Sequence, residues 1–153
     1  MLFRSLRRFD PARPVFVEAE SKKIGQLQVP AQLLERMREG ECLRLEVPVP
    51  ERVRFLTGEY RHFLEEPAAL KEKLQCLRNR YGHAVIDRWI AQTDSGAWEE
   101  LVADLLATHY DPSYLRAATQ NYLHYDGAQA LTLGRLDETG MARAAAELLK
   151  ADA

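Results

Sequence analysis

Charged side chains that could act on a phosphate group follow a short apolar run, residues 15–17, near the start of the chain. They are Glu18, Glu20, Lys22 and Lys23. We expect the apolar run to form a buried strand of a parallel sheet, because ligands of open α/β sheets bind at the carboxyl ends of strands. The carboxylates are then candidate catalytic groups beside a phosphate, and the lysines are candidate ligands of that phosphate. An ordinary polar loop after a strand is the alternative interpretation, and it stays open.

A pair of arginines, Arg52 and Arg54, follows a second apolar segment. The forked guanidinium group matches the oxygens of a phosphate or diphosphate, so both arginines are candidate phosphate ligands. The alternative is the charged outer face of an amphipathic helix, whose apolar face Val53 and Leu56 would supply. Both interpretations stay open.

Aromatic side chains gather around residues 109–114. His109 continues a helical apolar stripe, so it is either a hydrogen-bonded core residue or a weak catalytic candidate. Tyr110 and Tyr114 could stack on an unpaired nucleic-acid base, with a place in the core or at its rim as the alternative. Asp111 precedes a proline and is expected to cap the next helix.

Further basic residues could contact a phosphate backbone. Arg78 and Arg80 are candidates for contact with any nucleic-acid backbone, and an ordinary solvated face is the alternative. His83 and Asp87 are spaced as an i, i+4 pair, which favours a surface pair over a catalytic dyad. The sequence contains no paired CxxC and no HExxH, so no metal site is predicted.

The composition indicates one folded domain over residues 1–153. A hydrophobic fraction of 46% excludes extensive disorder, and a net charge of −2 provides no general attraction to nucleic acid. A nucleic-acid partner would therefore require a local basic patch. With no apolar run of membrane-spanning length, no membrane partner is expected, and cytoplasmic localisation is predicted.

The expected elements alternate between strands and helices. Strands are expected at residues 14–20, whose apolar run is 15–17, at 42–47 and at 128–133, and a closing helix at residues 139–150. Helices are expected from Pro30 to Gly40 and repeatedly after Pro48, with boundaries at Pro67, Gly82 and Gly96. This order predicts an α/β fold with a mostly parallel sheet of few strands and a large helical portion.

Three ungapped motifs resemble the C-terminal part of bacterial tRNA 2-selenouridine synthases. They are VFVEAESKKIG at residues 15–25, LRLEVPVPERV at residues 43–53 and HYDPSY at residues 109–114. The resemblance implies a P-loop NTPase-like domain preceded by a rhodanese domain. It implies replacement of sulfur by selenium in 2-thiouridine at the tRNA wobble position, through an S-geranylated intermediate. It also implies tRNA as partner, with selenophosphate and geranyl diphosphate as substrates and no covalently bound cofactor.

The resemblance places Glu18, Glu20 and Ser21 beside the phosphate loop and adds Ser21 to the candidate ligands. The sequence departs from the family, however, because it has neither GxxxxGK[ST] nor a rhodanese domain. We therefore expect an incomplete P-loop NTPase-like sheet with little or no activity alone. The alternatives are a non-catalytic anion- or tRNA-binding module and an assembly remnant of a split gene. A partner chain supplying the phosphate loop, or a homodimer, stays open.

Overall fold

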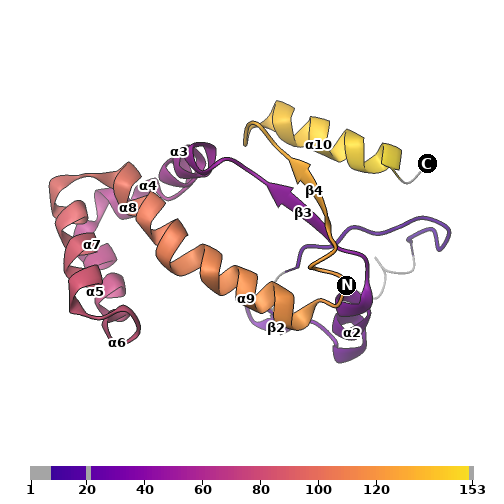
Figure 1. Cartoon of the computed structure of the whole chain (residues 1–153), viewed down its shortest axis with the longest axis horizontal. Coiled ribbons are helices and arrows are strands. Elements are labelled where there is room, and N and C mark those ends of the chain that lie inside the picture. The colour runs from indigo at the N-terminus through magenta and orange to yellow at the C-terminus, as the bar shows by residue number, and fades with distance from the viewer. Residues whose placement is uncertain (1–7, 20–21, 152–153) are drawn as a thin grey trace. The chain divides into compact units, whose positions relative to one another are not determined.

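The computed structural model describes residues 8–19 and 22–151 and divides into two compact units (Figure 1). The first, here called the mixed unit, comprises Met1–Leu45, Ala117–Leu131 and Asp137–Ala153. The second, the helical unit, comprises Glu46–Arg116 and Thr132–Leu136. Each unit is described by itself.

The mixed unit contains a β-hairpin and a following helix. Strands β1 (Lys23–Ile24) and β2 (Leu27–Gln28) are antiparallel, with Lys23 opposite Gln28. Gly25 has a φ of 60° in the two-residue loop, where a tight hairpin turn requires a positive value. Helix α2 (Ala31–Glu39) follows Pro30 and ends at Gly40, which confirms the predicted helix.

A second two-stranded sheet pairs segments far apart in the sequence. Strand β3 (Leu43–Glu46) neighbours β4 (Gln129–Thr132), and their arrows point the same way in Figure 1. Both strands are among those expected from the sequence. Helix α10 (Glu138–Ala151) follows, and the Asp137 carboxylate accepts a hydrogen bond of 2.8 Å from the Gly140 N–H at its start. The closing helix is therefore also confirmed.

The strand expected at residues 15–17 is wrong. The backbone there forms no strand, and the side chains of Val15, Phe16 and Val17 are 46%, 51% and 58% exposed. A buried parallel strand requires hydrogen-bonded neighbours, and none of the strands within residues 8–19 and 22–151 pairs with this segment. An apolar run therefore does not define a strand when no neighbouring strand completes its hydrogen bonds.

The helical unit places its core between three helices. The core residues are Leu74 of α5 (Pro67–Gln75), Ile86 and Trp89 of α7 (His83–Ser95), and Leu101 of α8 (Trp98–Leu105). The remaining elements are α3 (Val49–Glu59), α4 (Arg61–Glu65), α6 (Arg78–Tyr81), the π-helical turn η1 (Leu106–Tyr110) and the first residues of α9 (Asp111–Asn121). The apolar residues of these three helices recur at helical spacing, so each helix turns one apolar side to the core.

Membrane crossing is not indicated by the helices. Within the residues that the structure describes, none of them combines the length and the apolar character that a bilayer span requires.

Gly82 separates α6 from α7 and has a φ of 79° and a ψ of 173°. L-residues rarely adopt this conformation, so Gly82→Ala is expected to lower the free energy of unfolding by about 1–3 kcal/mol. Gly58→Ala is the matched control, because Gly58 lies in α3 and an added Cβ would have no heavy atom within 4 Å. This second change is expected to stabilise by about 0.5–1 kcal/mol. Urea denaturation followed by circular dichroism measures the change in the free energy of unfolding of each variant. Equal changes in the two variants would contradict the strain at Gly82.

Candidate functional site

Arg52 of α3 binds Asp111 at the start of α9 through two hydrogen bonds. Its Nη1 donates to Oδ2 at 2.9 Å and its Nη2 donates to Oδ1 at 2.6 Å. The side chains are 24% and 41% exposed, respectively. The hydrogen bond to Asp111 raises the pKa of Arg52 above its ordinary value, although burial acts in the opposite direction. The guanidinium is therefore a permanently charged group that is still partly open to solvent.

The expectation that Asp111 caps α9 is wrong. Turn η1 ends at Tyr110 and α9 begins at Asp111, so the helical backbone continues without a free N-terminus to cap. The carboxylate is consequently available to Arg52, and both of its oxygens accept from that side chain.

Tyr110 and Tyr114 form an exposed stacking platform beside Arg52. Their ring centroids are 6.0 Å apart with an angle of 9° between the planes, and they are 52% and 44% exposed. The Arg52 guanidinium carbon lies 6.0 Å from the Tyr110 ring centroid. Positions four residues apart share a helix face, which explains why the continuous helix through η1 and α9 brings the rings together.

Arg80 and Tyr81 of α6 contact the residues around the tyrosine platform. Arg80 Nη2 donates to Ser113 Oγ at 2.9 Å, and its guanidinium carbon lies 5.3 Å from the Tyr81 ring centroid. Tyr81 Oη and His109 Nδ1 are hydrogen-bonded at 2.7 Å, with the rings edge to face. We call the whole set the arginine–tyrosine cluster: Arg52, Arg80, Tyr81, His109, Tyr110, Asp111, Ser113 and Tyr114. It lies within the helical unit.

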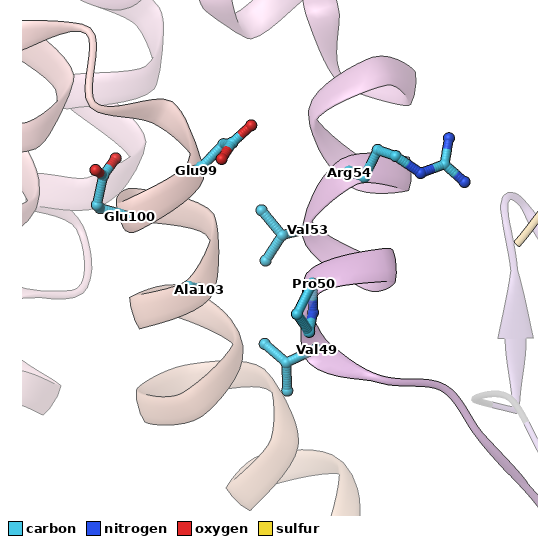
Figure 2. A pocket seen from close by; sticks show the side chains of 7 residues that line it. All are labelled: Val49, Pro50, Val53, Arg54, Glu99, Glu100 and Ala103. Atoms are coloured by element: carbon cyan, nitrogen blue, oxygen red, sulfur yellow. The ribbon is translucent and has the colours of Figure 1, made fainter. Parts of the chain in front are cut away.

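Arg54 does not join this cluster. It donates to Glu51, three residues earlier, at 2.9 Å, and this hydrogen bond lowers the pKa of Glu51. Arg54 also borders a groove of about 320 Å³ between α3 and α8, which is lined by Val49, Pro50, Val53, Arg54, Glu99, Glu100 and Ala103. Figure 2 shows its side chain pointing away from the two glutamates on α8. The carboxylates make this groove unsuitable for a phosphate.

Arg78 binds two residues of α7 that do not belong to the cluster. It donates to Asp87 Oδ1 at 2.8 Å and lies 3.1 Å from His83 Nδ1. The i, i+4 pair of His83 and Asp87 thus shares an arginine, as suits a surface pair.

The predicted catalytic carboxylates and phosphate ligands are divided between the two units. Glu18 and Lys22 are exposed, and Lys23 lies in β1 of the mixed unit, whereas Arg52 and Arg54 belong to the helical unit. Glu20 and Ser21 lie outside the described residues. No cluster of three or more metal-binding side chains occurs in the described part of the chain.

Sequence reasoning misses three members of the cluster. It assigns Asp111 to a cap, and it assigns no role to Tyr81 and Ser113. A signal for Tyr81 exists, because it follows Arg80 at the end of a helix. Arg52 and Asp111 are 59 residues apart, so no local pattern could pair them.

Comparison with known proteins gives one family. A family model described as tRNA 2-selenouridine synthase AAA domain matches residues 2–84, just over half of the chain. Of the arginine–tyrosine cluster, the matched segment includes Arg52, Arg80 and Tyr81 and ends before His109. No curated protein and no solved structure matches the chain. The family match confirms the family that the motifs indicate; it covers the motifs at residues 15–25 and 43–53, and HYDPSY at residues 109–114 lies outside it.

Proposed function

The chain belongs to the tRNA 2-selenouridine synthase AAA domain family, and from this premise we propose that it binds tRNA for the replacement of sulfur by selenium in 2-thiouridine. In this proposal selenophosphate and geranyl diphosphate are substrates of the reaction, which passes through an S-geranylated intermediate. The chain's contribution is to hold the RNA and an anionic ligand, in the cytoplasm.

The observation that supports this role best is the exposed pair Tyr110 and Tyr114 between two arginines. Unpaired bases of RNA loops stack on tyrosine rings, and guanidinium groups bind the neighbouring phosphates. Both arginines bind residues between the two tyrosines: Arg52 binds Asp111, and Arg80 binds Ser113. A chain with a net charge of −2 needs such a local patch to attract RNA.

The mixed unit supplies the remaining proposed ligands. Lys22 and Lys23 are assigned to the diphosphate or selenophosphate, together with Ser21, and Glu18 and Glu20 are assigned to the chemistry beside it. The support for these roles is the family resemblance of the motif at residues 15–25. Among the basic residues of the helical unit, Arg52 and Arg80 are preferred because their guanidinium groups lie beside tyrosine rings of the cluster, whereas Arg54 pairs with Glu51 and Arg78 with Asp87.

Filter binding to a tRNA that carries 2-thiouridine tests the proposal. The affinity is expected to fall steeply between about 50 mM and about 200 mM salt, because binding to phosphates releases counterions. The double variant Tyr110→Ala/Tyr114→Ala is expected to bind about ten-fold more weakly or worse, since each base–aromatic stack contributes about 1–3 kcal/mol.

Tyr60→Ala is the matched control, because Tyr60 is 51% exposed in the helical unit and its ring lies near His62 and Phe63, outside the cluster. It should leave the affinity unchanged. Absence of tRNA binding at the lowest salt would overturn the proposed function. Equal tRNA affinity of the wild type and the double variant would show that the tyrosine pair does not contribute to tRNA binding.

A further inference from the structure

We infer that Arg52 and the Tyr110–Tyr114 platform form a binding site for one unpaired nucleotide, whose phosphate position Asp111 occupies in the free protein. The inference rests on the proposed function, since it requires that the chain bind RNA. It adds a competitor within the chain, the Asp111 carboxylate, which occupies the position of the nucleotide's phosphate on Arg52.

The geometry of Arg52 is that of an arginine bound to an oxyanion. Two parallel N–H···O bonds of 2.9 Å and 2.6 Å join it to the two oxygens of Asp111. A phosphate presents its oxygens to a guanidinium in the same bidentate arrangement. The carboxylate of Asp111 therefore stands in for a phosphate group, and it occupies the donors that a phosphate would use.

The exposure of the pair allows this exchange. Arg52 is 24% exposed and Asp111 is 41% exposed, so a ligand can approach both groups from solvent. Ion pairs of this exposure stabilise a fold only slightly. Asp111 can therefore separate from Arg52 without loss of the fold and become hydrated, while the phosphate takes its place.

The tyrosine platform supplies the second half of the site. Its rings are nearly parallel and about half exposed, and Arg52 lies 6.0 Å from the nearer ring. A base stacked on the platform would have its phosphate within reach of the guanidinium. A base within a duplex is covered on both faces by its neighbours, so the platform selects an unpaired nucleotide.

Arg80 provides a second cation, whose partners among the described residues are neutral. The structure gives it Ser113, a neutral hydroxyl, and the Tyr81 ring as partners, and no acidic partner among the described residues. It can bind a neighbouring phosphate with Asp111 in place. A substitution at Asp111 should therefore change phosphate binding by Arg52 and leave phosphate binding by Arg80 unchanged.

The first test compares Asp111→Asn with Glu51→Gln. Each change removes one negative charge from the helical unit, but Glu51 pairs with Arg54 outside the cluster. The probe is an RNA hairpin with an unpaired loop, titrated by fluorescence anisotropy. Asp111→Asn is expected to bind about three- to ten-fold more tightly than the wild type, because the competitor loses its charge. Weaker binding by Asp111→Asn, or a gain in affinity no larger than that of Glu51→Gln, would overturn the inference that a phosphate replaces Asp111 on Arg52.

The second test examines the platform with the hairpin and a fully paired duplex of the same stem sequence. Tyr110→Ala is expected to lower hairpin affinity at least about five-fold and to leave duplex affinity nearly unchanged. Tyr110→Phe keeps the ring and should bind both as the wild type does. Circular dichroism checks that each variant is folded.

The outcomes separate this inference from the proposed function. If the wild type binds neither RNA, both fail. If it binds hairpin and duplex with equal affinity, the RNA-binding function stands and the nucleotide site is wrong. A hairpin preference that Tyr110→Ala abolishes, together with tighter binding by Asp111→Asn, supports the site as described.

Discussion

Replacing Trp89 by alanine is expected to lower the free energy of unfolding by about 3–5 kcal/mol, the usual cost of removing a large aromatic side chain from a core. Trp89 is 0% exposed. Its ring packs against Tyr81 at 5.5 Å between centroids, and its Nε1 donates to Asp104 Oδ2 at 3.0 Å. The variant therefore loses both the packing of three helices and a hydrogen bond. Urea denaturation followed by far-ultraviolet circular dichroism measures the loss.

Two further variants identify the cause of that loss. Trp89→Phe keeps an aromatic ring and removes the hydrogen bond, so it should lose clearly less stability than alanine. Tyr60→Ala removes a half-exposed ring from the same unit and should change stability by no more than about 0.5 kcal/mol. A loss below about 1 kcal/mol for Trp89→Ala would contradict the position of Trp89 at the centre of the core.

Asp104→Ala is expected to cost about 2–3 kcal/mol, because one carboxylate accepts hydrogen bonds from three side chains. Arg88 donates through Nε at 2.7 Å and through Nη2 at 3.0 Å. Trp89 Nε1 and Thr108 Oγ1 donate at 3.0 Å and 3.1 Å. Removing the carboxylate leaves the Trp89 N–H without its acceptor beside a closed core. Denaturant titration at neutral pH measures this effect.

The contribution of Asp104 should also depend on pH. Burial acts to raise the pKa of Asp104, but hydrogen bonds from Arg88, Thr108 and Trp89 outweigh it, and the pKa lies below its ordinary value of 3.8. A carboxyl whose pKa is lowered by folding stabilises the fold above its unfolded pKa. That stabilisation disappears as the pH falls through the folded pKa. The difference in stability between the wild type and Asp104→Asn should therefore narrow below about pH 4.

Asp94→Asn is the control for this acid dependence. Asp94 is 54% exposed and pairs with Lys71 at 2.7 Å, so its contribution to stability is small. A wild-type advantage over Asp104→Asn that stays constant on acidification would contradict the ionised network around Asp104.

Local chemistry makes most helix boundaries predictable. Proline lacks an N–H and suits the first turn of a helix, as at Pro67, and glycine accepts a positive φ, as at Gly82 and Gly96. The apolar stripes at helical spacing predict the core residues for the same reason: the period of a helix is a local property. The combination of many helices with few strands, β3 and β4 among them, is also indicated by the sequence, but the described strands form two separate two-stranded sheets and not one mostly parallel sheet.

Strand pairing and the site partners depend on contacts between distant residues. Residues 15–17 have the composition of a buried strand, yet they form none, because pairing requires a neighbour that composition does not specify. Tyr110 and Tyr114 are candidates by type and spacing, and the structure places them in a stack.

The sequence by itself determined the family, the helices and the residue types that can bind RNA or phosphate, since these follow from motifs and from interactions over a few residues. Only the tertiary structure decided which arginines join the tyrosines. Arg52 and Arg54 are equivalent in the sequence, but helix α3 directs Arg52 to Asp111 and Arg54 to Glu51. The physical reason is that a helix sends positions two apart to different faces, and packing against other elements decides what each face meets.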